Sequence, residues 1–163
     1  MTYYIIIRGS LGCGKTTISK GLAKQLKAEY LSIDEIVDSQ DKAKDGFISE
    51  KSFLKANELI IPRIKDYLDE GKKVIIDGNF YRKSQLDDLI FKLKDYQNYT
   101  FTLKAPLKIC IERDSKRKNS LGKDAAEVVY SITTKFDYST VIENKSMKET
   151  IKKIVKEINS KII

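Results

Sequence analysis

The sequence predicts an α/β fold with three layers, in which a five-stranded parallel sheet lies between two layers of helices. Strand-like and helix-like patterns alternate along the whole chain of 163 residues. The strand-like runs are apolar without polar alternation, which is typical of strands buried on both faces of a parallel sheet. The chain has 41% hydrophobic residues and no repeats or low-complexity linkers. Residues 1–163 are therefore expected to form a single domain.

Short β-branched or aromatic runs predict the five strands, which are Tyr3–Ile7, Tyr30–Ile33, Lys73–Ile76, Tyr99–Leu103 and Thr140–Glu143. Apolar residues at helical spacing predict helices at Ile18–Leu26 and near residues 51–70, 86–93, 106–117, 122–136 and 147–158. Pro62 falls inside the helix of residues 51–70 and is expected to kink or divide it. Residues 35–50 show little periodicity.

Several classes of protein are excluded by composition. No apolar run approaches the roughly 18 residues that a membrane span needs, and the N-terminus lacks the features of a signal peptide. Two cysteines, Cys13 and Cys110, are too few for a disulfide framework and indicate reduced thiols. The chain has no histidine, so a histidine base or histidine-bound metal is excluded. We therefore expect a cytoplasmic monomer or homodimer with no membrane partner.

The net charge of +8 is concentrated in two segments. Residues 104–123 carry seven Lys or Arg against two acids, and residues 145–161 carry six Lys against two Glu. Such positive regions attract nucleotide phosphates, a phosphorylated substrate or nucleic acid. The alternative is a Lys-rich solvated surface, which is the favoured interpretation of the second segment.

The strongest functional signal is the segment Gly9-Ser10-Leu11-Gly12-Cys13-Gly14-Lys15-Thr16. It matches the phosphate-binding loop (P-loop) pattern Gly-x-x-x-x-Gly-Lys-Thr, and it lies between a predicted strand and a predicted helix, as that loop requires. Gly9, Gly12 and Gly14 permit positive φ angles and close approach of the backbone. The N–H groups of residues 9–17, including Thr17, are expected to surround the phosphates of ATP beside a helix N-terminus.

Three side chains of this loop have separate expected roles. Lys15 is expected to reach the β- and γ-phosphates of ATP, and the hydroxyl of Thr16 to ligate Mg²⁺. Cys13 is interpreted as a small residue that the loop tolerates, with its side chain pointing away from the phosphates.

Asp34 follows the second predicted strand, at the sheet edge where open α/β sheets bind their ligands. A carboxylate there could orient or deprotonate an attacking hydroxyl, so Asp34 is a candidate catalytic and substrate-binding residue. The alternative is that Asp34 caps a helix that starts at Glu35.

Asp77 closes the third predicted strand, which is typical of the second P-loop signature and predicts a Mg²⁺ ligand. Asn79 and Arg82 follow on a loop at the same edge and are candidate substrate-binding residues. Arg82 could contact a substrate phosphate or carboxylate with two donors, or could be a solvated surface cation.

Residues 112–123 form the densest charge run and predict a basic lid. Arg113 and Arg117 are spaced one helical turn apart, so they are expected to face the same side and to stabilise the charge that develops on the transferred phosphoryl group. The alternative is an exposed helix end whose cations favour the helix dipole.

Taken together, these segments resemble the small P-loop kinases of the nucleoside-monophosphate-kinase-like fold, over nearly the whole chain. The resemblance covers Gly9–Thr17, Ile33–Ile36, Ile76–Arg82 and Glu112–Arg117. These stretches look like the phosphate loop, acceptor-side Asp, second signature and lid of shikimate kinase, gluconate kinase, chloramphenicol phosphotransferase and polynucleotide kinases. The resemblance implies the sheet order 2-3-1-4-5, and it implies that Asn144 contacts adenine.

The sequence departs from two of these groups after the third strand. Shikimate kinases carry a glycine triplet where this chain has Asp77-Gly78-Asn79, and adenylate kinases carry Phe-Pro-Arg where it has Asn79-Phe80-Tyr81-Arg82. The favoured function is therefore ATP- and Mg²⁺-dependent transfer of phosphate to another hydroxyl, on a small metabolite, a nucleoside or a polynucleotide 5′ end. The alternatives are a nucleoside-monophosphate kinase and a regulatory ATPase without an acceptor.

Overall fold

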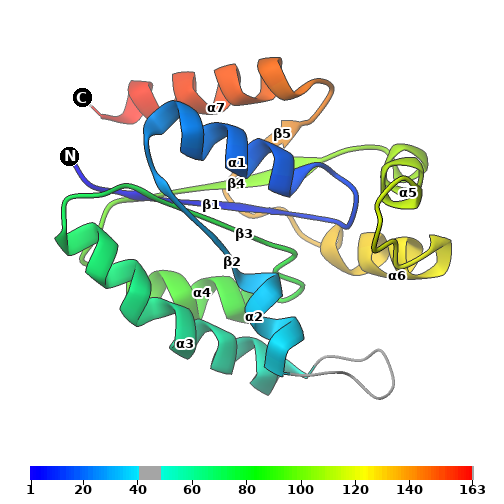
Figure 1. Ribbon diagram of the computed structural model, residues 1–163, viewed down its shortest axis with the longest axis horizontal. Helices are drawn as coiled ribbons and strands as arrows, with labels where there is room; N and C mark the ends of the chain where they lie inside the picture. Colours follow the sequence, from blue (N-terminus) through cyan, green and yellow to red (C-terminus); the bar gives the residue numbers. More distant parts are fainter. Residues whose placement is uncertain (41–48, 163) are drawn as a thin grey trace.

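The computed structural model describes residues 1–40 and 49–162 and contains the predicted five-stranded sheet (Figure 1). All neighbouring strands are parallel, and their order is β2-β3-β1-β4-β5, as the sequence predicts. The strands are β1 (Tyr4–Gly9), β2 (Glu29–Ser32), β3 (Val74–Gly78), β4 (Asn98–Lys104) and β5 (Thr140–Glu143).

Helices cover both faces of the sheet, which confirms the three-layer prediction (Figure 1). One face is covered by α1 (Lys15–Leu26) and α7 (Met147–Lys161), and the other by α3 (Glu50–Asp69) and α4 (Lys83–Lys92), with α2 (Ile33–Gln40) beside them. Two further helices, α5 (Leu107–Ser115) and α6 (Lys123–Thr133), lie beyond one end of the sheet. The phosphate loop opens at that same end, because it follows β1.

The central strand β1 links the two halves of the core, and all six of its residues are buried. Ile5 and Ile7 pack with Ile18, Leu22 and other residues on the side of α1 and α7. Tyr4 and Ile6 point to the opposite face and pack among the residues of α3 and α4. This double burial explains the unbroken apolar run, since a strand with helices on both faces has no solvated side.

Most element boundaries shift by up to three residues from those predicted, and three differences from the expectations affect the site or the core. The strand β2 ends at Ser32, and α2 begins at Ile33, so Asp34 lies in the first turn of a helix. The helix α3 continues through Pro62, which is exposed, while Ile60 and Ile64 on its inner side hold it against the core. The helix α5 ends at Ser115, two residues earlier than expected. Of the segment with little periodicity, residues 41–48 lie outside the described residues.

Within the described parts of the chain, no helix is long and apolar enough to cross a membrane.

Candidate active site

The phosphate loop joins β1 to α1, and its glycines serve two different purposes. Gly12 and Gly14 have φ angles of 77° and 96°, in the region that favours glycine. The positive φ that we expected at the loop glycines is present at Gly12 and Gly14 and absent at Gly9. A Cβ atom on Gly9 would lie 2.6 Å from the Cys13 sulfur and 2.7 Å from the carbonyl oxygen of Leu103. Gly9 is therefore required for close packing against β4.

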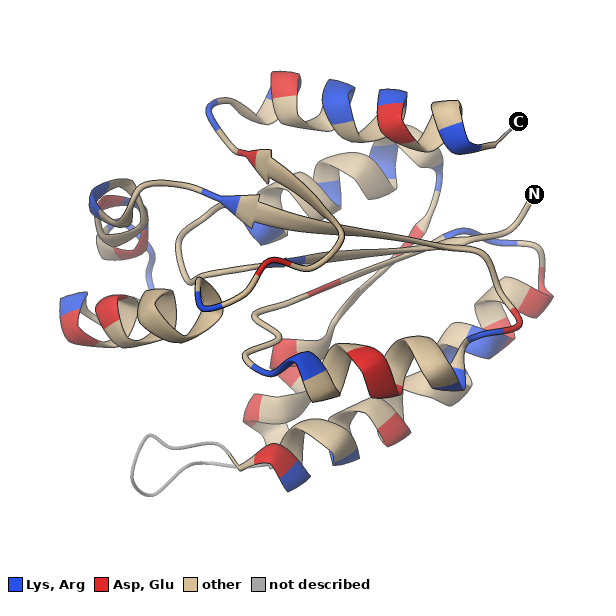
Figure 2. Cartoon of the chain, turned by 180° about the vertical axis from the view of Figure 1, so that it is seen from behind, with Lys and Arg blue, Asp and Glu red and all other residues tan. Residues whose placement is uncertain are grey.

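Lys15 lies at the start of α1 with its ammonium group held inside the loop. Its Nζ donates a hydrogen bond of 3.0 Å to the carbonyl oxygen of Ser10, and only 8% of the residue is exposed. Thr16 and Thr17, by contrast, are exposed at the mouth of the loop. The helix α1 contains basic residues and no acidic ones, as its colouring in Figure 2 shows, so no carboxylate of this helix opposes an anion at its N-terminus.

Cys13 is fully buried and its main-chain carbonyl connects the loop to two other segments. The oxygen accepts a bond of 2.9 Å from Asn144 Nδ2 and one of 3.3 Å from Arg113 Nη1. Asn144 is itself fixed, because its Oδ1 accepts a bond of 2.9 Å from the Thr150 hydroxyl of α7. The structure thus brings Arg113 and Asn144 together at the outer side of the loop.

A cavity of about 540 Å³ opens beside this contact. That volume lies within the range of ordinary small-molecule sites. Arg113 and Asn144 are among the polar groups at its wall. Its apolar wall is formed by Ala105, Pro106 and Ile109, with the ring-bearing Tyr130 of α6. The arrangement suits a flat, partly apolar group attached to a phosphate chain that runs into the loop.

Asp34 lies on the other side of Lys15, where β2, α2 and β3 meet. Both oxygens of its carboxylate accept the main-chain N–H of Asn79, at 3.1 and 3.0 Å. The close approach of the segment around Asn79 to Asp34 depends on Gly78, because a Cβ atom on Gly78 would collide with the side chain of Ile33. Burial raises the pKa of Asp34 to about 6, although the charge of Lys15 and the Asn79 N–H oppose the rise.

Asp77 lies near the end of β3 and is 2% exposed. Its Oδ2 accepts a bond of 2.9 Å from the Tyr30 hydroxyl. Burial raises the pKa of Asp77, while the Lys15 charge and hydrogen bonds from Tyr30, Ser32 and Thr16 oppose the rise. The structure therefore brings Lys15, Thr16, Asp34 and Asp77 to one sheet edge.

The oxygen donors at this edge fit a magnesium ion. The described residues contain no group of three His, Cys, Asp or Glu side chains that could hold a metal by themselves. Mg²⁺ does not need such a group, since it is usually bound by one or two carboxylates together with substrate phosphates and water. Thr16 lies close enough to oppose the rise in the pKa of Asp77, and the two offer a hydroxyl and a carboxylate beside the phosphate loop.

The other predicted site residues are less closely grouped. The prediction that Arg113 and Arg117 share a helix face is wrong, because α5 ends at Ser115 and Arg117 lies beyond it. Its side chain is 54% exposed, and its nearest described acid is Asp114 at 3.7 Å. Arg82 is exposed just before α4 and makes no side-chain hydrogen bond or ion pair with any described residue. The Nδ2 of Asn79 donates to the Tyr81 hydroxyl at 3.1 Å.

Sequence reasoning missed four residues of this region. The Tyr30 hydroxyl donates to Asp77, and the Tyr81 hydroxyl accepts from the Asn79 side chain. Burial, together with the nearby charge of Asp34, raises the pKa of Tyr81 to about 12. Tyr130 lines the large cavity, and Arg8 is buried directly before the phosphate loop. Only Arg8 had a signal in the sequence, since a charge interrupts an otherwise apolar strand.

The sequence matches the family described as AAA domain over residues 5–136, which include the phosphate loop, both aspartates and α6. The chain belongs to this AAA domain family. A shikimate kinase of Thermodesulfovibrio yellowstonii is 26% identical, over 94% of this chain and 93% of that protein. A shikimate kinase of Oceanobacillus iheyensis is 41% identical, over 52% of this chain and 48% of that protein.

Solved structures of kinases share the fold. A gluconokinase from Sinorhizobium meliloti superposes with a TM-score of 0.77 at 11% identity, over 97% of this chain and 92% of that chain. A shikimate kinase from Acinetobacter baumannii, solved with shikimate, gives a TM-score of 0.65 at 18% identity, over 100% and 96%. The predicted resemblance to small P-loop kinases is confirmed, and the relatives of this AAA domain protein indicate a kinase.

Proposed function

We propose that this protein transfers the γ-phosphate of ATP, in the presence of Mg²⁺, to a hydroxyl group of a small metabolite. The observation that carries the proposal is the position of Asp34, a carboxylate near Lys15 and the phosphate loop with a pKa raised to about 6. A general base is most effective when its pKa lies near the working pH. The kinase relatives support the reaction class.

ATP, the phosphate donor, would be bound partly in the cavity outside the loop and partly on the loop itself. The nucleoside would occupy the cavity of about 540 Å³ beside Asn144 and Arg113, and the triphosphate would lie on the loop N–H groups and the N-terminus of α1. Lys15 would leave the Ser10 carbonyl for the β- and γ-phosphates. Thr16 and Asp77 would hold Mg²⁺, which neutralises phosphate charge when bound.

The acceptor hydroxyl would lie against Asp34. The bond between the γ-phosphorus and the bridging oxygen breaks as the bond to the acceptor oxygen forms, and ADP leaves with the bridging oxygen. The hydroxyl proton passes to Asp34, whose carboxylate is held in place by the N–H of Asn79. The closing lid would bring Arg113, and Arg117 from the end of α5, to the transferred group.

We expect shikimate itself to be a poor acceptor, although relatives carry that name. The chain has Asn79 where shikimate kinases have a third glycine, and the Asn79 side chain, which bonds the Tyr81 hydroxyl, occupies space at the acceptor edge that a glycine would leave open. A side chain with an amide favours an acceptor with further hydroxyl groups, such as a sugar or sugar acid.

The test is a screen of acceptors with γ-labelled ATP, with and without Mg²⁺. The panel includes shikimate, gluconate, simple sugars, nucleosides, nucleoside monophosphates and oligonucleotides with a free 5′-hydroxyl. Label transferred to a hydroxyl of one small acceptor, with loss in Asp34→Asn, supports the proposal. ATP hydrolysis that no acceptor stimulates would instead indicate a regulatory ATPase, and transfer to a monophosphate would indicate a nucleoside-monophosphate kinase.

A further inference from the structure

Arg8 is a buried charged residue that neither the phosphate-loop motif nor the proposed reaction uses. It lies in β1 directly before Gly9, and it is 0% exposed. The strand alternation places it on the same face as Tyr4 and Ile6, which belong to the apolar core under α3 and α4. A guanidinium at such a position needs partners, because an unpaired buried charge is strongly unfavourable.

The partners of Arg8 are main-chain carbonyls. Its Nη2 donates to the oxygens of Thr133, at 2.8 Å, and Phe80, at 3.5 Å. Its Nη1 donates to the oxygen of Phe136, at 3.1 Å, and to the Thr102 hydroxyl, at 3.4 Å. The guanidinium also lies 4.2 Å from the centre of the Phe136 ring. Among the described residues, no carboxylate forms an ion pair with it.

These contacts join three parts of the site that are distant in sequence. Phe80 follows Asn79 at the acceptor edge, and Thr133 is the last residue of α6, the helix that follows the predicted lid of residues 112–123. The last carbonyls of a helix have no partner within the helix, and a cation is favourable there. Arg8 therefore caps α6 from inside the core, next to the residue that begins the phosphate loop.

Three partners of Arg8 belong to the main chain, so an apolar residue at this position would leave these carbonyls without a donor. Burial lowers the pKa of Arg8 only to about 10, so its charge is present at neutral pH. What an apolar side chain lacks is a planar set of donors that fixes several carbonyls at defined angles.

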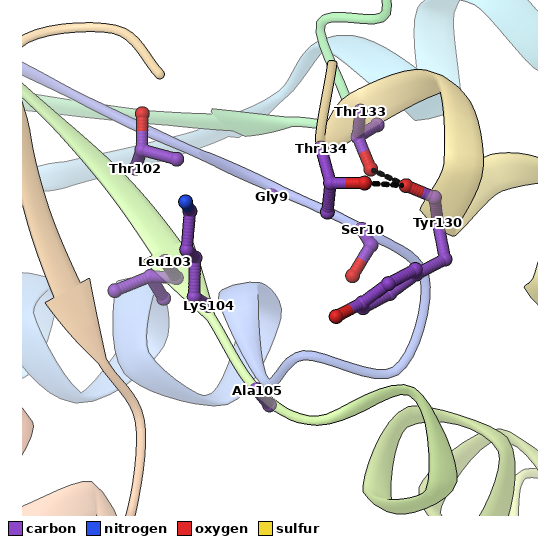
Figure 3. A pocket seen from close by; sticks show the side chains of 9 residues that line it. All are labelled: Gly9, Ser10, Thr102, Leu103, Lys104, Ala105, Tyr130, Thr133 and Thr134. Atoms are coloured by element: carbon purple, nitrogen blue, oxygen red, sulfur yellow. Dashed lines mark hydrogen bonds between the residues drawn. The ribbon is translucent and has the colours of Figure 1, made fainter. Parts of the chain in front are cut away.

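A small cavity lies at this junction between α6 and the start of the phosphate loop. Figure 3 shows a small cavity between Gly9, Ser10 and the end of α6, lined by Thr133, Thr134 and the ring of Tyr130. Its volume of about 10 Å³ is enough for about one water molecule. The hydroxyls of Thr133 and Thr134 bond back to Tyr130 in their own helix and do not reach β1 (Figure 3).

We propose that Arg8 is a positioning residue that fixes the end of α6 and the Phe80 loop to the strand that enters the phosphate loop. The end of α6 and the acceptor edge then share one anchor next to the start of the phosphate loop. The anchoring itself does not depend on the proposed function. Its use in ordering α6 around a bound nucleotide rests on that proposed function.

The experiment compares Arg8→Lys and Arg8→Met with the control Arg63→Lys, an exposed arginine that contacts only Tyr67 of its own helix. Hydrogen exchange is followed by mass spectrometry in peptides covering residues 78–82 and 123–136, without ligand and with the Mg²⁺ complex of the β,γ-imido analogue of ATP. Thermal unfolding and the affinity for the analogue are measured on the same samples.

In Arg8→Lys we expect exchange in both peptides to rise about tenfold or more without ligand, since charged hydrogen bonds that hold these segments are lost. The analogue should bind within about threefold of wild type yet no longer protect residues 123–136. Phe136→Leu, which keeps every carbonyl and removes the ring, should give a smaller rise. If Arg8→Met does not fold, Arg8→Lys and Phe136→Leu still decide the matter.

Exchange in both peptides that matches Arg63→Lys, or a loss of protection spread evenly over the chain, would overturn the proposal. The two proposals can fail separately. A wild-type protein that does not bind the analogue would refute the proposed function, while the exchange without ligand would still test the anchor.

Discussion

The donor side and the acceptor side of this site are built in different ways, although Lys15 lies between them. On the donor side, the contacts of the loop are made by main-chain groups, such as the Cys13 carbonyl that holds Arg113 and Asn144. On the acceptor side, the groups are the carboxylates of Asp34, which is partly buried, and Asp77, which is buried; they come from α2 and β3.

This difference separates what each side can do. Main-chain groups at a helix N-terminus bind any phosphate chain of suitable shape and do not change charge with pH. Carboxylates with raised pKa values can accept a proton, and their state depends on pH. We therefore expect substitutions on the donor side to affect binding of ATP, and those on the acceptor side to affect turnover and its pH dependence.

The largest effect is expected at the residue that both sides share. Lys15→Ala removes the cation that the γ-phosphate would contact, and phosphate transfer should fall by about 10³-fold. The fold should survive, because among the described residues the Lys15 ammonium bonds only the Ser10 carbonyl. Steady-state kinetics and thermal unfolding check this, with Lys24→Ala on the exposed side of α1 as the control. Turnover like that of wild type would contradict the assigned role of the loop.

Asp34→Asn tests the acceptor side alone. The amide keeps the size of the side chain and cannot take a proton, so kcat should fall by about 10²-fold. The KM for ATP should stay nearly unchanged, whereas substitutions on the donor side are expected to raise it. The neighbouring exposed acid offers a matched control in Glu35→Gln. Appreciable turnover in Asp34→Asn would favour a phosphate acceptor, which needs no base.

The pH dependence should also belong to the acceptor side. Because the raised pKa of Asp34 is about 6, kcat/KM should rise with pH through about 6, where the base loses its proton. A raised carboxyl pKa favours the protonated form in the folded state, so its stabilising contribution is present at low pH and is lost as pH rises through 6.

Asp34→Asn should accordingly raise the free energy of unfolding by about 1–3 kcal/mol at pH 8. At pH 4 it should change that free energy little, because most of the carboxyl is then protonated. Denaturant unfolding at the two pH values measures this, and equal shifts at both would contradict the assigned pKa.

A smaller effect is expected from the lid arginines on the donor side. Arg113→Ala removes the bond to the Cys13 carbonyl and should raise the KM for ATP by about tenfold. Arg117→Ala should raise it less, since the Arg117 side chain is 54% exposed and, within the described part of the chain, pairs only with Asp114. Initial-rate kinetics over a range of ATP concentrations compares the two. A larger KM effect in Arg117→Ala would mean that the closed lid differs in arrangement from this structure.

The sequence by itself determined the donor side and the overall architecture. The loop Gly9–Thr16 is contiguous, and its chemistry depends on glycines and a helix start that one stretch of sequence encodes. The strand order 2-3-1-4-5 came from the resemblance and is confirmed. The apolar strand pattern required helices on both faces, so the layers followed as well.

Only the tertiary structure decided how the acceptor side is assembled. Its contacts join segments that are far apart in the chain, such as Asn79 with Asp34 and Arg8 with Phe80, and the local sequence does not identify the partners. The raised pKa of Asp34 depends on burial, which no spacing predicts. Arg117 was misplaced because the end of α5 is set by packing, whereas helical spacing assumes that the helix continues.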